Sequence, residues 1–481
     1  MTILKTSLLL LAATAAAYSA SCSDDPSVDN PGTTRSTSGG PAGPTSTGTG
    51  GGTTTGTGTG AGGTGGAGGA SCGDIAPRPV VELTGPVTSD LALSADNDYL
   101  MKGLIFVEAP ATLTIPPGTR LLGDKASMAT LVIKPGAKII AEGTECEPIV
   151  FTSQAPQGDR AAGDWGGVIV LGNAPINVPG GTAQVEGILG GTYGGANAAD
   201  NSGRIRYVRI EYSGILLSPD NEVNGLTLAG VGSGTEIDYV QVRHTLDDCF
   251  EFFGGTVNAK HLVCTYNQDD GFDWDFGYGG KLQFLALQQD PNVADDTNGF
   301  EGDNDAAGSL NAPVSEPTIY NATLCGKNVD VDKQQYGMLL RRSTRAHLKN
   351  VIATGFEAGI DIRDGNADID LTHSIFFGNV TENIAYPEPD PAGAGVLKDD
   401  DGGFDEATWF LEAGPMNSAV DPMIPGCFTV GAPDFRPAAT ITTNAATPPD
   451  DGFFDPAAAY VGAFTAEDTW IKGNWVKYDL D

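Results

Sequence analysis

A six-residue motif occurs twice near the middle of the chain, and its spacing strongly restricts the possible folds. DDCFEF begins at Asp247 and returns as DDGFDW at Asp269, 22 residues later. The residues between the two copies lack helical periodicity. A repeat of this length is typical of a solenoid, in which each turn of the chain packs only on its neighbours. The sequence therefore predicts an all-β fold, a parallel β-helix.

Two series of short strands follow this period from Ile205 onward. One begins with IRYVRIEY, IDYVQVRH and KHLVCTY, and the other with NGLTL, DCFEF and DGFDW. Alternate side chains of a strand point to opposite faces, so one side of the second series should form the core. The predicted core residues are Leu226, Leu228, Phe250, Phe252, Phe272, Trp274, Phe300, Ile360 and Ile362. The predicted outer residues are Thr227, Glu251, Asp273, Glu301 and Asp361.

A polar residue precedes the small residue in several repeats of the second series, and two interpretations are open. Asn and Asp tolerate turn conformations and bond neighbouring backbone groups, which favours a ladder at one corner of the coil. The alternative is that these side chains are ligands or catalytic groups at the surface. The four residues are Asn224, Asp248, Asp270 and Asn298.

The N-terminal residues predict export. A basic residue, a short apolar run and then small residues precede Cys22, which predicts a signal peptide over residues 1–21. The sequence SASC ending at Cys22 resembles a bacterial lipobox, so Cys22 is the predicted lipidation site, and cleavage after Ala20 is the alternative. Residues 22–79 are rich in Gly, Thr and Ser and predict a flexible tether. We expect an outer-membrane or cell-surface lipoprotein, or a secreted protein.

The cysteine count is consistent with lipidation. The chain has 7 cysteines, an odd number for an exported protein. If Cys22 carries lipid, an even number remains for disulfides or buried thiols. The remaining cysteines are Cys72, Cys146, Cys249, Cys264, Cys325 and Cys427.

The domain organisation follows from where the repeat begins and stops. We predict the β-helix over residues 80–385 and a loop-rich segment with a C-terminal cap over residues 386–481. Asp405 is the expected N-cap of a short helix in that segment. Residues 453–481 are expected to be a strand-rich cap over the open end of the coil, because an uncovered sheet edge aggregates.

The chain resembles the right-handed parallel β-helix (pectin-lyase-like) superfamily, and in particular its exported and largely uncharacterised bacterial lipoproteins. The likeness rests on GAKIIAEGTECEPIVFTS, GDWGGVIVLGNAPIN, DDCFEFFGGTVNAKHLV and NQDDGFDWDFGYGGKLQF, together with the terminal YVGAF and two tryptophans. It covers roughly residues 80–480. The resemblance implies a right-handed, single-stranded parallel β-helix and supplies little function.

Acidic residues gather on consecutive repeats and predict a cation site. Like charges stacked a few ångströms apart cannot all remain ionised and unpaired. Some are protonated, or Lys and Arg neutralise them, or a hard cation such as calcium lies among the oxygens. Asp364, Asn366, Asp368 and Asp370 form a second, weaker candidate, which lacks the glycine of a calcium loop. The predicted calcium ligands are Asp247, Asp248, Glu251, Asp269, Asp270, Asp273 and Glu301.

The same carboxylates allow an enzymatic alternative. Asp247-Asp248-Cys249 resembles the Asp-Asp-Cys of polygalacturonases, so Asp247, Asp248, Asp269 and Asp270 are candidate catalytic residues. That family's Gly-His-Gly and Arg-Ile-Lys partners are absent. A pectate-lyase-like reaction would need calcium and a base, for which Arg341, Arg342 and Arg363 are candidates, although arginine equally neutralises stacked acids.

We therefore expect an exported binding or structural module with an acidic, calcium-binding flank, and a polysaccharide lyase or hydrolase as the alternative. A net charge of −35 repels nucleic acid and anionic lipid. The expected partner is a polysaccharide or another cell-surface component, and membrane contact is expected only through the N-terminal lipid. An open groove along the acidic flank would favour the enzyme.

Overall fold

The computed structural model describes residues 72–73, 76–216, 222–293, 297–330, 335–363, 368–386, 404–412, 414 and 416–480. The predicted signal peptide, Cys22 and most of the predicted tether lie outside these residues. Among the residues described, no helix has the length and apolar character needed to cross a membrane.

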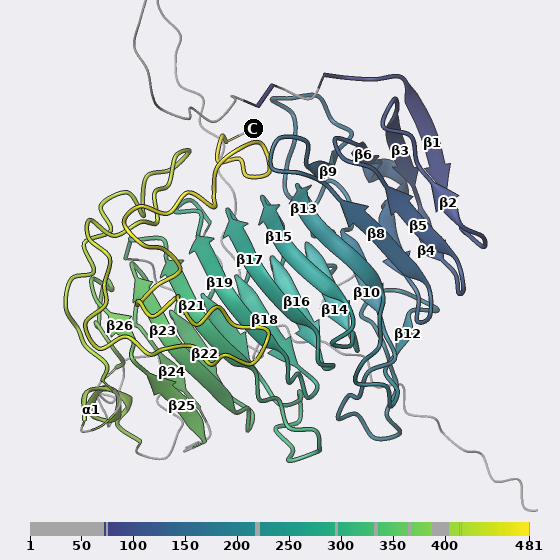
Figure 1. Ribbon diagram of the computed structural model, residues 1–481. Helices are drawn as coiled ribbons and strands as arrows, with labels where there is room; N and C mark the ends of the chain where they lie inside the picture. The colour runs from purple at the N-terminus through teal and green to yellow at the C-terminus, as the bar shows by residue number, and fades with distance from the viewer. Residues whose placement is uncertain are drawn as a thin grey trace, which may run out of the picture. The chain divides into compact units, whose positions relative to one another are not determined.

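Two stacked sheets of parallel strands form the folded part of the chain (Figure 1). The smaller sheet contributes one strand to each turn of the coil. The larger sheet contributes the other two faces, because β8 and β9 pair with the first and second halves of β13. The predicted parallel β-helix is therefore confirmed. The smaller sheet consists of β4 (Leu104–Val107), β7 (Thr130–Ile133), β10 (Val168–Leu171), β14 (Leu226–Ala229), β16 (Phe250–Phe253), β18 (Phe272–Asp275), β20 (Phe300–Gly302), β22 (Met338–Leu340) and β24 (Asp361–Ile362).

The larger sheet runs along the whole coil, from an edge at β1 to an edge at β25. Its strands are β1 (Val80–Thr84), β2 (Leu91–Ala92), β3 (Asp98–Lys102), β5 (Thr112–Ile115), β6 (Arg120–Gly123), β8 (Lys138–Glu142), β9 (Ile149–Ser153), β13 (Gly203–Glu211), β15 (Glu236–Arg243), β17 (Asn258–Thr265), β19 (Lys281–Gln288), β21 (Thr318–Cys325), β23 (Ala346–Thr354), β25 (Ile369–Thr372) and β26 (Ile375–Phe376). A small antiparallel hairpin, β11 (Ala183–Gln184) and β12 (Thr192–Tyr193), protrudes from the insertion after β10.

The long strands of the larger sheet bend at one left-handed residue each. Tyr207, Tyr239 and His261 have φ values of 50°, 54° and 52°, and the strand pairing skips them. This conformation is uncommon for a residue with a Cβ, so its recurrence defines one corner of the coil. The rings at the corner stack: the centroids of Tyr207 and Tyr239 are 4.5 Å apart, and those of Tyr239 and His261 are 4.1 Å apart.

The interior of the coil is one continuous apolar core, as the alternation of the second series predicted. Phe250 and Phe272 stack with ring centroids 5.3 Å apart, and Phe300 lies on the next turn of the coil. All of the predicted core residues belong to this cluster, each exposed by 1% or less. The core residues confirmed are Leu226, Leu228, Phe250, Phe252, Phe272, Trp274, Phe300, Ile360 and Ile362.

A short helix covers the C-terminal end of this core. Helix α1 (Glu406–Leu411) begins after Asp405, whose carboxylate accepts a hydrogen bond from the Thr408 amide, as the sequence predicted. Phe410 of the helix stacks on Phe376 with ring centroids 4.3 Å apart and joins the interior core. The helix therefore caps the coil.

The predicted role of residues 453–481 as a strand-rich end cap is wrong. The C-terminal strap, which we define as residues 417–480, contains no strand among its described residues and lies along the left-handed corner (yellow in Figure 1). Asn350 exchanges two hydrogen bonds with the backbone of Ala446, and Gln241 exchanges two with Lys477. The strap satisfies polar groups along the flank, a role that its short apolar runs do not reveal.

Three disulfides join the six cysteines of the folded part. The pairs are Cys72–Cys146, Cys249–Cys264 and Cys325–Cys427. The second lies in the interior core and joins the residue before β16 to β17, the next strand, and the third ties the strap to β21. Each bridge also limits the freedom of the unfolded chain.

Candidate functional site

The predicted outer residues of the smaller sheet lie in one row. Thr227 pairs with Glu251, Glu251 with Asp273, and Asp273 with Glu301 across four adjacent strands. We call Glu251, Asp273 and Glu301 the acid row. These acids lie outside the core, as predicted, but they do not line an open groove, because their exposed fractions are 3%, 2% and 6%.

The chain inserted after β10 explains much of this burial. The row begins with Val132 and Ile169, which pack in one apolar cluster with Val185 and Ile188 of the insertion. Glu186, between these two residues, is close enough to Glu251 for its charge to raise the pKa of that carboxyl. The insertion therefore shields the first acid of the row from water.

The polar residues at the adjacent corner form the predicted ladder. The Asp270 amide donates to Asp248 Oδ1 at 2.7 Å, and the Asn298 amide donates to Asp270 Oδ1. The Tyr336 amide continues the series with a 3.0 Å bond to Asn298 Oδ1. Asn224 differs, because its Nδ2 donates to Glu251 Oε2. Asp248, Asp270 and Asn298 thus each accept a hydrogen bond from the backbone of the following turn of the coil.

Two groups of carboxylates converge beside this ladder. Oxygen atoms of Asp248, Glu251 and Asp273 lie within 4.8 Å of one another, and so do oxygen atoms of Asp247, Asp248 and Asp269. We call Asp248, Glu251 and Asp273 the carboxylate cluster. Asp248 belongs to both groups, which places it between two concentrations of negative charge.

Burial and mutual repulsion disfavour ionisation in the carboxylate cluster. Burial, followed by the charges of Asp269 and Asp247, raises the pKa of Asp248 well above its usual range. Burial, followed by the charges of Glu186 and Asp247, raises the pKa of Glu251. Burial, followed by the charges of Glu301 and Glu251, raises the pKa of Asp273. Without a cation these groups hold protons at a pH where free carboxyls do not.

One oxygen of the carboxylate cluster accepts no hydrogen bond from the described residues. Asp273 Oδ1 is buried and accepts no hydrogen bond from the residues described. Among the described residues, no lysine or arginine forms an ion pair with Asp248, Glu251 or Asp273. Carboxylate oxygens that converge without a basic partner are the ligand type that calcium prefers. These residues therefore fit a hard cation.

On the following turns of the coil, arginine side chains pair with the buried acids. Arg341 Nη2 binds Glu301 Oε1, and Arg341 Nε lies 3.1 Å from Asp303 Oδ1. Arg342 Nη1 lies 2.7 Å from Asp303 Oδ2. We call Glu301, Asp303, Arg341 and Arg342 the arginine cluster. Arg363 pairs with Asp361 at 3.1 Å, so all three arginines considered as bases are partners of acids.

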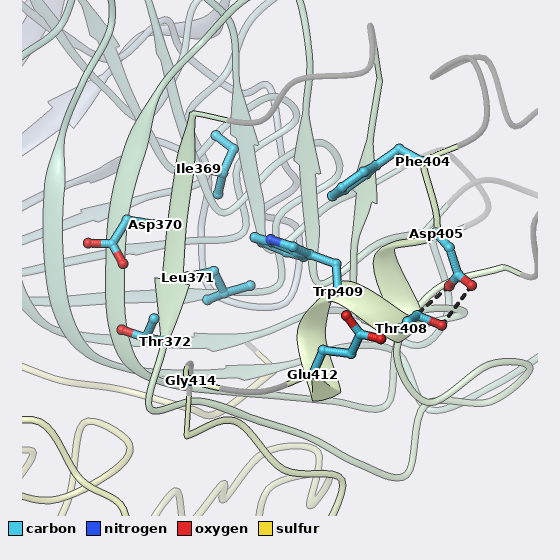
Figure 2. A pocket seen from close by; sticks show the side chains of 10 residues that line it. All are labelled: Ile369, Asp370, Leu371, Thr372, Phe404, Asp405, Thr408, Trp409, Glu412 and Gly414. Atoms are coloured by element: carbon cyan, nitrogen blue, oxygen red, sulfur yellow. Dashed lines mark hydrogen bonds between the residues drawn. The ribbon is translucent and has the colours of Figure 1, made fainter.

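The four candidate catalytic residues occupy unequal positions. Asp248 and Asp270 are 6% and 4% exposed and accept the ladder hydrogen bonds. Asp247 is 8% exposed, and Asp269 is half-buried. The pocket in Figure 2 lies elsewhere, between β25 and α1. Asp247, Asp248 and Asp270 are therefore buried, and Asp269 alone of the four is partly exposed.

The second, weaker calcium candidate does not form a cluster in the part of it that can be described. Asp368 pairs with Arg345 at 3.2 Å, and Asp370 pairs with Lys349 at 2.9 Å. Asp364 and Asn366 lie outside the described residues.

Two polar neighbours of the carboxylate cluster escaped the sequence reasoning. Asn224 was assigned to the corner, yet it donates to Glu251, and Glu186 belongs to the insertion. The repeat itself aligns Asn224 with Asp248 and so signals that it lies near the cluster. The path of the insertion is not periodic, and no sequence signal points to Glu186.

Comparison with known proteins yields one match. A family model described as a pectate-lyase like beta helix domain matches residues 85–385. Neither the curated proteins nor the solved structures contain a match to this chain.

Proposed function

The chain belongs to the pectate-lyase-like β-helix family, and from that premise we propose that it is an exported module that binds Ca²⁺ through the carboxylate cluster and acts by binding rather than by catalysis. One observation carries the proposal: Asp248, Glu251 and Asp273 converge in a buried place without a basic partner among the described residues. A bound cation would relieve their repulsion and satisfy Asp273 Oδ1.

The burial of the acids supports binding over catalysis. A polysaccharide chain needs an open groove with an acid and a base at its floor. Glu251, Asp273 and Glu301 are each exposed by 6% or less. Asp248 is already engaged by the Asp270 amide. A polysaccharide lyase or hydrolase remains the second candidate, because the family model carries a pectate-lyase-like description.

Calcium titration of the chelator-treated protein tests the metal. We expect saturable binding by calorimetry, and at one hundred times the dissociation constant a gain of about 2.7 kcal/mol in the free energy of unfolding. The double variant Glu251→Gln with Asp273→Asn should lose both effects. Glu82→Gln, which changes an exposed acid on β1, is the matched control and should lose neither. Absence of a calcium effect in the native chain would refute the proposal.

The enzymatic alternative is tested with the calcium-loaded protein. We expect no new unsaturated or reducing ends from polygalacturonate and from neutral polysaccharides. Release of such ends that disappears in Asp269→Asn would establish the second candidate in place of the first.

Export and lipidation are the remaining part of the proposal. The three disulfides support an oxidising compartment, and they use every cysteine except Cys22. Cys22→Ser should move the protein from the membrane fraction to the soluble fraction of cells that express the full chain. Equal membrane association of the variant and the native chain would argue against a lipid anchor at Cys22.

A further inference from the structure

A pocket of about 600 Å³ opens between the last coil and α1, several turns away from the acid row. Figure 2 shows Ile369 and Leu371 on the side of β25 that faces the helix, and the rings of Phe404 and Trp409 opposite them. The two rings are tilted by 56°, with centroids 5.6 Å apart. Aliphatic and aromatic groups thus form two walls of one recess.

The polar groups that the described residues bring to the pocket are neutral or acidic. Asp405 and Glu412 contribute carboxylates, and none of the described residues that line the pocket is lysine, arginine or histidine. Asp370 carries its carboxylate on the side of β25 away from the helix (Figure 2) and pairs there with Lys349 at 2.9 Å. Hydrogen bonds from Thr408 lower the pKa of Asp405, so its charge persists below neutral pH. The pocket is therefore negative.

We propose that this pocket binds a quaternary ammonium group, such as that of choline. Ring faces of Trp and Phe attract cations through their quadrupoles, and the methyl groups of such a ligand also contact aliphatic walls. The acidic rim supplies the opposite charge, with Glu412 exposed at the end of α1.

The same features disfavour other ligands. A carboxylate or phosphate ligand would meet the charges of Asp405 and Glu412, and a metal ion would gain little from the two rings. Among the described residues, no group of possible metal ligands includes a pocket residue. A neutral apolar ligand would leave the acidic rim without a partner.

The test compares choline with dimethylbutanol, its neutral carbon isostere, by NMR titration of the calcium-saturated protein and of the chelated protein. We expect choline to bind at least about tenfold more tightly than the isostere, since cation–π attraction at a desolvated site is worth about a factor of ten or more. The choline affinity should be the same in the calcium-saturated protein and in the chelated protein. A failure to bind choline is therefore distinguishable from a failure to bind calcium.

Variants assign the effect to the pocket. Trp409→Ala should weaken choline binding by about tenfold, and Trp409→Phe, which keeps a ring, should weaken it less. Glu412→Gln should weaken binding of choline without affecting the isostere, and Glu82→Gln is the control for the general negative charge. Unchanged NMR signals of Phe410, which stacks on Phe376, in the Trp409→Ala variant show that its lost binding is not a loss of α1. Equal binding of choline and isostere, or tighter binding of glucosamine than of choline, would overturn the proposal.

Discussion

The carboxylate cluster and the arginine cluster occupy neighbouring stretches of one sheet face, yet they differ in what faces the acids. Arg341 and Arg342 bind Glu301 and Asp303 directly. Asp273, one strand away from Glu301, has an oxygen without a hydrogen-bond donor among the described residues. The two clusters therefore allow a direct comparison. Both contain buried acids, but arginine neutralises the acids of the arginine cluster, and among the described residues no basic side chain pairs with those of the carboxylate cluster.

This comparison teaches that a row of acids in a solenoid does not share one function. Each turn of the coil contacts only its neighbours, so each position in the row depends on a few local residues. Charge repulsion must be resolved turn by turn. Where arginine is present, its charge lowers the pKa of the neighbouring acids, although burial still raises the pKa of Glu301 to about 8. Where arginine is missing, only protons or a bound ion can relieve the repulsion.

The largest effect is expected from removing the built-in cation. Arg341→Met would leave Glu301 and Asp303 buried, with Arg342 at the edge of the cluster as the remaining arginine partner of Asp303 and with the Asn298 side-chain amide as a neutral donor to Glu301. Breaking a buried ion pair on one side costs about 3–5 kcal/mol. We expect this loss in the free energy of unfolding from urea titrations in the presence of a chelator.

The matched control is Arg342→Met, because the Arg342 side chain is more exposed than that of Arg341 and pairs with Asp303 from the edge of the cluster. We expect it to cost about 1 kcal/mol or less, as a partly exposed pair does. Calcium should restore part of the stability of Arg341→Met and raise the binding stoichiometry by one ion, because the vacated place now resembles the carboxylate cluster. Unchanged stability and unchanged calcium stoichiometry in Arg341→Met would contradict the claim that Arg341 takes the place of a bound cation.

A smaller effect is expected from pH. Burial and repulsion raise the pKa of Asp248, Glu251 and Asp273 above their unfolded values near 4. The native state then binds more protons than the unfolded state. The stability that these three groups contribute to the chelated protein is therefore fully present below the unfolded pKa near 4 and falls as pH rises through the native pKa values. Each such group contributes up to about 1.4 kcal/mol per pH unit while it titrates.

Calcium competes with these protons, so its stabilising effect should grow as pH rises. The double variant Glu251→Gln with Asp273→Asn should reduce the pH dependence measured by urea unfolding of the chelated protein, and the remainder should come from Asp248 and Glu301, whose pKa values are also raised. Glu236→Gln removes an exposed acid of β15 and should leave the slope unchanged. Stability of the native chain in chelator that rises with pH above about 5, where carboxyls with lowered pKa values such as Glu211 are already ionised, would contradict the raised pKa values.

The sequence predicted the periodic parts of this protein and missed the aperiodic ones. The period of 22 residues placed Phe250 and Phe272 in the core and Asp248 and Asp270 at the corner, because a solenoid converts sequence spacing directly into stacking. The burial of Glu251 depends on where the insertion after β10 folds back, and periodicity carries no information about that path.

Long-range partners were missed for the same reason. Arg341 lies 40 residues from Glu301. The sequence offered it both as a base and as a partner of stacked acids, and the structure confirms the second alternative, but no spacing indicated which acid it would pair with. The C-terminal strap contacts Gln241 across 236 residues through backbone groups, which every sequence possesses. The charge repulsion could be predicted from the spacing of the acids, but the way each acid is neutralised could not.

The smallest effect is expected at Asn224, whose Nδ2 donates to Glu251. Asn224→Ala should cost about 1 kcal/mol in the free energy of unfolding, the usual value of one hydrogen bond. It should also weaken calcium binding by about tenfold, because a ligand that loses its hydrogen-bonded neighbour is less well oriented. Asn258→Ala is the control: Asn258 Oδ1 accepts a hydrogen bond from the Lys281 amide on the other sheet. We expect the same stability loss there and unchanged calcium binding by calorimetry. Equal calcium affinities in the two variants would mean that Asn224 supports the fold alone, and that Glu251 binds calcium without its help or does not bind it.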